Sequence, residues 1–163
     1  MTASTIPTRT TAGTTTAGLV DPRGLQFNAA LTSVVLAAIL ILAPGPLGIT
    51  LLAVQAGLFA TGVALGVRRT PVAILFARVI RPRLAPPREL EDARPPRFAQ
   101  AVGLVFAVVG LIGYLFASPL VGAIAVGFAL VAALLNAIFN FCLGCEVYLL
   151  LRRAGLPLPL QTN

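Results

Sequence analysis

The 163-residue chain has no histidine, no lysine, only five acidic residues and only two cysteines. Without histidine it lacks the side chain that most often acts as general acid, general base or metal ligand near neutral pH. Four of the five carboxylates lie in loops, and only Glu146 falls inside an apolar segment. These absences exclude most acid–base and metal chemistry and leave the cysteines as the residues best able to carry covalent chemistry.

Charge is scarce as well, since 10% of the residues are charged and 58% are hydrophobic. In soluble domains about a quarter of the residues are charged. Several apolar runs approach or exceed about 18 residues, the length that requires a bilayer rather than a protein core. The composition therefore predicts an integral membrane protein of one domain, with no room for a separate soluble catalytic domain.

The net charge of +7 comes from twelve arginines. Such a basic balance is typical of nucleic-acid binding, but the arginines cluster beside the apolar runs, where membrane orientation and anionic head groups explain them better. We therefore expect the bilayer, with its anionic head groups, as a partner and expect no nucleic acid. Arginine without lysine, among abundant Ala, Gly, Val and Leu, indicates a GC-rich genome, hence a bacterium and its inner (plasma) membrane.

Apolar runs separated by proline-containing turns predict an all-α bundle of four transmembrane helices in two hairpins. We expect the spans at residues 27–43, 47–67, 98–117 and 120–141, within a single membrane domain at 19–153. Residues 1–18 form a Thr/Ala-rich tract with too little apolar surface to pack, and we expect it to be disordered. It also lacks the pattern of a cleaved signal peptide. Residues 154–163 are expected to be a C-terminal tail.

The arginines predict the orientation of the bundle. Residues 68–97 are strongly basic and contain a short apolar piece at 71–80, too short to span and expected to form an interfacial helix. The two short turns, 43–46 and 118–119, carry no charge. The positive-inside rule then places both termini and the 68–97 loop in the cytoplasm.

The last apolar run is too long for one span. Residues 120–151 would form a helix of about 48 Å, against a hydrocarbon core of about 30 Å. We expect the run to tilt, or to leave the bilayer between Asn140 and Gly144, because Gly144 weakens a helix at that point. Tyr148, near its end, is expected to anchor the chain at the membrane interface.

A few amide side chains lie within the apolar spans. Asn136, Asn140 and Gly144 follow at intervals of four and would share one face of a helix, with Asn28 and Gln100 as candidate partners from other helices. Such residues either hold helices together through hydrogen bonds or line a substrate path, and we favour the first reading. On a continuous helix the cysteines would project away from this face.

The two cysteines, Cys142 and Cys145, have the C-x-x-C spacing. This spacing allows a reversible disulfide, and a nearby positive charge or helix N-terminus would activate one thiol. Two alternatives remain open: soft-metal binding, which would need a dimer to supply four thiolates, and simple packing. Glu146 is a candidate proton acceptor, or it pairs with an arginine of the loop.

Three segments carry a resemblance to a known family. They are D-P-R-G-L-Q-F-N at 21–28, R-F-A-Q at 97–100 and N-A-I-F-N-F-C-L-G-C-E-V-Y at 136–148. Over roughly residues 18–153 the chain resembles the bacterial membrane family called domain of unknown function 4395. That family has no established activity. Its members are similar in context to proteins encoded near thioredoxin-like and sulfurtransferase (rhodanese-like) partners, which implies thiol or sulfur metabolism.

The sequence therefore predicts a membrane-embedded thiol-redox or sulfur-relay component that works with a thioredoxin-like or sulfurtransferase partner at the cytoplasmic side. Cys142 and Cys145 would be the redox pair, and we expect no cofactor and no metal site within one chain. A small transporter or channel for a sulfur species and a non-catalytic structural membrane subunit are the alternatives. The oligomeric state is left open.

Overall fold

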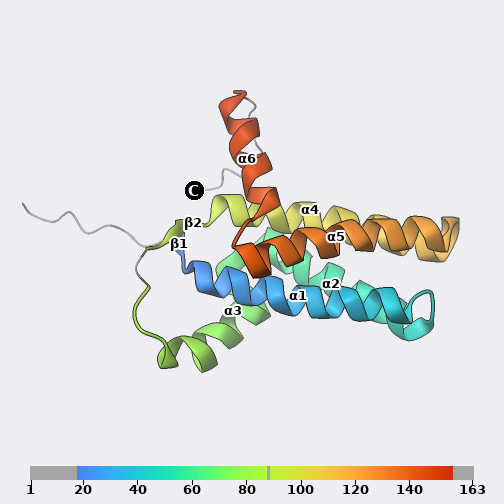
Figure 1. Cartoon of the computed structure of the whole chain (residues 1–163), viewed down its shortest axis with the longest axis horizontal. Coiled ribbons are helices and arrows are strands. Elements are labelled where there is room, and N and C mark those ends of the chain that lie inside the picture. The colour runs from blue at the N-terminus through green and yellow to red at the C-terminus, as the bar shows by residue number, and fades with distance from the viewer. Residues whose placement is uncertain (1–17, 88, 156–163) are drawn as a thin grey trace, which may run out of the picture.

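The computed structural model describes residues 18–87 and 89–155, and its main body is a bundle of four long helices (Figure 1). These helices are α1 (Pro22–Leu42), α2 (Pro46–Leu65), α4 (Arg94–Ile112, continued by a π-helical turn at Gly113–Ala117) and α5 (Pro119–Phe139). All four are long and apolar enough to cross a bilayer. The protein is therefore an all-α, multi-pass membrane protein. Residues 1–17 of the N-terminal tract that is expected to be disordered lie outside the described residues. So do residues 156–163 of the C-terminal tail.

α1 and α4 begin several residues earlier than hydropathy predicts, because their first turns contain Arg23 and Arg94. The Asp21 side chain accepts a hydrogen bond from the Arg23 backbone N–H at 3.0 Å, and Pro22 occupies the first helical turn of α1. Ser118 caps α5 in the same way by accepting from the Leu120 N–H at 3.3 Å. Capping residues and proline at the first position start a helix before its apolar residues do.

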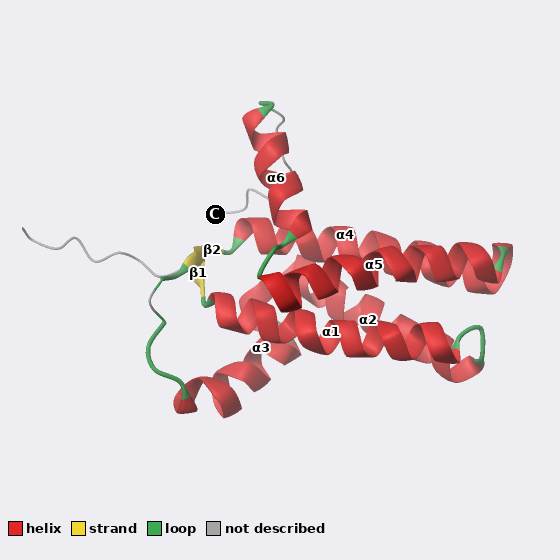
Figure 2. Ribbon diagram, in the orientation of Figure 1, coloured by secondary structure: helices red, strands yellow, loops and turns green. Residues whose placement is uncertain are grey.

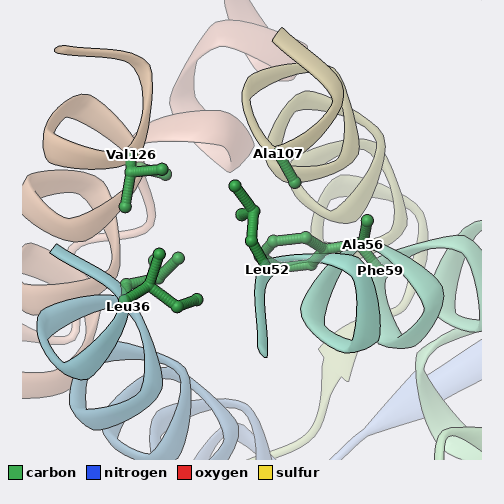
Figure 3. Close-up of a cluster of buried hydrophobic side chains, with 8 residues drawn as sticks. Leu36, Leu52, Ala56, Phe59, Ala107 and Val126 are labelled. Atoms are coloured by element: carbon green, nitrogen blue, oxygen red, sulfur yellow. The ribbon is translucent and has the colours of Figure 1, made fainter. Parts of the chain in front are cut away.

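The two hairpins interlock. α1 packs mainly against α5, and α2 packs mainly against α4, so that each helix meets the other hairpin more closely than its own partner. Side chains from all four helices meet in the core shown in Figure 3. Leu36, Ile39, Leu52 and Val126 are each no more than 1% exposed there.

The end of the bundle opposite the two turns carries the shorter elements (Figure 2). The strand β1 (Leu19–Val20) pairs antiparallel with β2 (Glu91–Asp92), which fixes the start of α1 beside the start of α4. The predicted short helix is present as α3 (Pro71–Leu75) and a π-helical turn (Phe76–Ile80), between two 3₁₀ turns at Val67–Arg69 and Arg81–Arg83.

One arginine of this end has a structural role that the charge pattern did not reveal. The Arg97 guanidinium donates from Nε to the Val63 carbonyl at 2.7 Å and from a terminal nitrogen to the Ala64 carbonyl at 3.4 Å. These carbonyls lie in the last turn of α2, where they have no partner inside the helix. Arg97 therefore caps the C-terminus of α2. Its positive charge also interacts favourably with the negative end of the helix dipole.

Candidate functional site

The long last apolar run breaks into two helices at Asn140. α5 ends at Phe139, and Asn140 adopts the left-handed conformation with φ 54° and ψ 26°. Its N–H donates to the Asn136 carbonyl at 3.1 Å, and the Phe141 N–H donates to the Leu135 carbonyl at 3.3 Å. The following helix, α6 (Leu143–Arg153), projects sideways from the bundle (Figure 1). The break lies in the predicted region but depends on Asn140, one of the few residue types that adopt this conformation.

Gly144 has a packing role instead of breaking the helix. It lies in the first turn of α6, where an added Cβ would come within 2.7 Å of the Ala99 Cβ and 2.8 Å of the Ala99 Cα. The absence of a side chain lets α6 approach α4 closely. Tyr148 extends this contact between α6 and α4. Its side chain is 1% exposed, and its ring centroid lies 5.7 Å from the ring centroid of Phe98. The expectation that Tyr148 anchors the chain at the interface was wrong, since its ring is buried between helices.

Cys142 and Cys145 form a disulfide at the N-terminus of α6, with a Cα–Cα distance of 5.1 Å. Cys142 is the extended N-cap residue, and Cys145 lies three residues later in the first turn. The Cys145 backbone N–H donates to the Cys142 Sγ at 3.3 Å. Both residues are half-buried. The Cys142 sulfur therefore lies at the positive end of the helix dipole, with a backbone donor directed at it.

A cavity of about 220 Å³ lies beside the disulfide, between α1, α4, α5 and α6. It brings together five of the residues that the sequence singled out: Asn28, Gln100, Asn136, Cys142 and Gly144. The expectation that the cysteines point away from the asparagine face is wrong for Cys142 and Asn136. That expectation assumed a continuous helix, and the break at Asn140 turns Cys142 back toward the bundle.

Other predicted residues lie outside this cavity. Asn140 is exposed at the end of α5, and Cys145 and Glu146 are absent from the lining. The lining also contains aromatic and small side chains that sequence reasoning missed, among them Phe59, Ala99, Phe106, Phe128 and Ala132. Their apolar character did not distinguish them from lipid-facing residues.

The three amides of the cavity are not joined to one another by hydrogen bonds. The Gln26 amide donates to the Ala137 carbonyl at 2.9 Å, but within residues 18–87 and 89–155 the amides of Asn28, Gln100 and Asn136 make no comparable bond. No fully buried side-chain nitrogen or oxygen of these residues lacks a partner. Because the three amides line a cavity, their polar atoms are open to whatever fills it.

Asn28 and Gln100 also line two neighbouring cavities of about 300 Å³ and 90 Å³. The larger of these lies at the charged end, beside Arg68 and Arg81. The smaller reaches Gln55 of α2. Both residues therefore occupy the meeting point of the three hollow spaces.

Glu146 lies in the first turn of α6 with its side chain exposed. Arg94 and Asp92 form an ion pair at 3.3 Å, and within residues 18–87 and 89–155 no ion pair involves Glu146. Arg152 and Arg153 lie in the last turn of the same helix. An acidic residue at the start and basic residues at the end both suit the dipole of α6. The role of Glu146 as a proton acceptor stays a prediction.

A single chain offers few metal ligands. Among the described residues, no group of three or more His, Cys, Asp or Glu side chains lies together. Both sulfurs are joined to each other in this structure. Metal binding by a dimer with both pairs reduced stays a prediction.

No curated protein and no solved structure matches this chain. The family model described as Domain of unknown function (DUF4395) matches residues 20–153. This match includes all four long helices, the break at Asn140 and the cysteine pair. The chain therefore belongs to the DUF4395 family.

Proposed function

We propose that this protein is a thiol-redox component of the bacterial plasma membrane that exchanges electrons or sulfur with a thioredoxin-like or sulfurtransferase partner. The observation that carries the proposal is the disulfide at the N-terminus of α6, with Cys142 as the N-cap residue. A cysteine at this position gains thiolate character from the helix dipole and from backbone donors, and the thiolate is the reactive form. Simple packing cysteines need neither feature.

The exchange proceeds through a mixed disulfide. A thiolate of the partner attacks the Cys142 Sγ, the bond to Cys145 breaks, and Cys145 leaves as a thiolate that takes up a proton. The partner's second thiolate then attacks its own sulfur in the mixed disulfide and releases the Cys142 thiolate. The partner dithiol is oxidised and the Cys142–Cys145 pair is reduced by two electrons. The hydrogen bond donated by the Cys145 backbone N–H stabilises the Cys142 thiolate that is released in the second step.

The location of the pair supports a soluble partner at the cytoplasmic side. α6 lies at the end of the bundle that carries the basic 68–97 segment, and the turns at the opposite end have no charge. The positive-inside rule directs the basic end toward the cytoplasm. Arg152 and Arg153 extend the positive surface along α6. An exposed Glu146 next to Cys145 is well placed to take the proton of a thiol.

The test is to trap the mixed disulfide in native membranes. Cys145→Ser leaves Cys142 as a single thiol that can attack the oxidised form of the partner. Because Cys145 is then missing and cannot release the partner from Cys142, the adduct should accumulate, visible as a band that a reductant abolishes. Cys142→Ser is the matched control and should give little or none. Maleimide labelling across graded redox buffers should show the wild-type pair cycling between dithiol and disulfide. Thiols that never form a disulfide at any potential would refute the proposal.

A transporter for a small sulfur species is the second candidate. The observation in its favour is that Asn28 and Gln100 line three adjoining cavities, which gives polar groups along a path from the charged end. Against it, Leu36, Ile39, Leu52 and Val126 fill the interior nearer the turns and are at most 1% exposed. A transporter must open this packed part. The test is uptake of labelled thiosulfate by proteoliposomes. Uptake that persists in the Cys142→Ser, Cys145→Ser double variant would favour transport over redox exchange.

A further inference from the structure

The cavity beside the disulfide has a polar end and an apolar end. Asn136 is eight residues nearer the charged end of the bundle than Phe128 on α5, and Gln100 is six residues nearer than Phe106 on α4. The amides therefore share the end at which Cys142 lies. The rings of Phe106 and Phe128 lie deeper, with centroids 6.3 Å apart. Eight residues of helix correspond to about 12 Å of depth.

The cavity also opens toward the lipid. Two of its lining side chains, Phe128 and Val131, are 60% and 55% exposed on the outer surface of α5. These residues lie in a helix long and apolar enough to span the bilayer. A molecule dissolved in the hydrocarbon can therefore reach Cys142 without passing through water.

We infer that this cavity binds the head group of a membrane quinone, which reoxidises the Cys142–Cys145 dithiol; the inference rests on the proposed thiol-redox function. A quinone ring presents two carbonyl oxygens that accept hydrogen bonds from amide N–H groups, and its flat face packs against aromatic rings. The volume of about 220 Å³ is below the range for a whole drug-sized ligand, so the head enters and the tail stays in the lipid.

The electron balance of this step closes without any other reactant. The Cys142 and Cys145 S–H bonds break and the S–S bond forms, which releases two electrons and two protons. The quinone takes up both electrons and both protons at its two carbonyl oxygens and leaves as the quinol. Combined with the exchange proposed above, one partner dithiol is oxidised for each quinone reduced, and the electrons enter the membrane pool.

A lipid acyl chain is the other occupant that an apolar cavity admits. It has no acceptor for the amides of Asn28, Gln100 and Asn136, and it takes no electrons from a dithiol. The amides at the disulfide end, together with a redox-capable pair, therefore favour the quinone. If an acyl chain is the occupant, the dithiol will not react with quinones, which the experiment below detects.

The experiment uses the full-length protein in lipid nanodiscs, reduced with dithiothreitol and desalted. One portion receives ubiquinone with a single isoprene unit, and another receives oxidised glutathione as a water-soluble oxidant. Loss of maleimide-reactive thiols and formation of quinol are followed together. We expect the quinone to form the disulfide with one quinol produced per pair of thiols lost.

Ala132→Phe fills the cavity, because Ala132 is a half-buried lining residue of α5. It should slow oxidation by the quinone about tenfold or more and leave oxidation by glutathione unchanged. Ala123→Phe is the matched control: Ala123 is half-buried on the same helix but outside the cavity, and both rates should stay at the wild-type level.

The outcomes separate this inference from the proposed function. Oxidation by glutathione but not by the quinone overturns the quinone site and leaves the thiol-redox function standing. An equal quinone rate in wild type and Ala132→Phe, with Ala132→Phe folded by size-exclusion chromatography, overturns the site as well. If neither oxidant forms the disulfide, the proposed function itself fails.

Discussion

Near the two turns, the interior of the bundle is filled by Leu36, Ile39, Leu52 and Val126, whereas toward the charged end the same helices enclose a cavity lined by three amides and a cysteine. The four side chains of the packed part are at most 1% exposed, as expected of a close-packed protein interior. The hollow part keeps polar groups inside the membrane, where they are expensive unless they serve a ligand or a helix contact. Under the proposed function, the turn end stabilises the fold and the charged end carries the chemistry.

The largest expected effect tests the packed part. Leu52→Ala should lower the free energy of unfolding by about 2–4 kcal/mol. The Leu52 side chain is 0% exposed, and its truncation leaves a cavity in the packed interior. Denaturation with dodecyl sulfate in mixed micelles measures this change. Val54→Ala, at a 56% exposed position of the same helix, is the control and should change stability little.

The same variant also tests whether the two ends of the bundle act independently. In the folded fraction, Leu52→Ala should oxidise and reduce its cysteine pair at the wild-type rate, since Leu52 does not line the cavity beside Cys142. A large change in thiol chemistry without loss of stability would contradict the division into a stabilising and a reactive end.

The next effect tests how α6 is held on the bundle. Gly144→Ala places a methyl group within 2.8 Å of the Ala99 backbone and should destabilise the protein by about 1–3 kcal/mol through overpacking. It should also change the alkylation rate of Cys142, because it displaces the N-terminus of α6. Hydrogen exchange of α6 amides gives a local readout of the same displacement.

Gly127→Ala is the matched control for this change. Gly127 lies in α5 with nothing within 4 Å of an added Cβ. Because alanine favours a helix over glycine, this variant should be neutral or more stable by up to about 1 kcal/mol. Equal loss of stability in both glycine variants would contradict the close contact between α6 and α4.

A smaller effect concerns the two thiols themselves. In single-cysteine variants at neutral pH, iodoacetamide should alkylate Cys142 about tenfold faster than Cys145, because the dipole of α6 and the Cys145 N–H both favour the Cys142 thiolate. Mass spectrometry of the modified peptide over time gives both rates. Equal rates would mean that the helix N-terminus does not activate Cys142.

The sequence predicted the class of fold but only part of the site. Apolar runs and charge-free turns are local signals, so four spanning helices follow from them directly. The break between Asn140 and Gly144 was also expected, but from the weaker helix propensity of Gly144. A single left-handed residue leaves no periodic signal, and the assumption of a continuous helix then placed Cys142 on the wrong side of Asn136.

The cavity could not be predicted because it depends on how helices distant in sequence pack together. Asn28, Gln100 and Asn136 were singled out because amides are rare in hydrocarbon, and the structure brings them together around a hollow space. Their expected role was to bond neighbouring helices. Whether a buried amide faces a partner or a cavity depends on the distances between α1, α4 and α5, which no local pattern in the sequence reports.

The smallest expected effect tests the residue that divides the two last helices. Asn140→Gly should leave stability nearly unchanged, because glycine adopts the left-handed conformation without strain. Asn140→Val should cost about 1–2 kcal/mol, because a side chain branched at Cβ clashes with the backbone there. Thermal unfolding in detergent compares the two variants, and both substitutions remove the same exposed amide, so the loss of its hydration cancels between them. If valine is tolerated as well as glycine, the left-handed turn does not fix the position of α6, and the orientation of Cys142 toward the cavity must come from the contact between Gly144 and Ala99 alone.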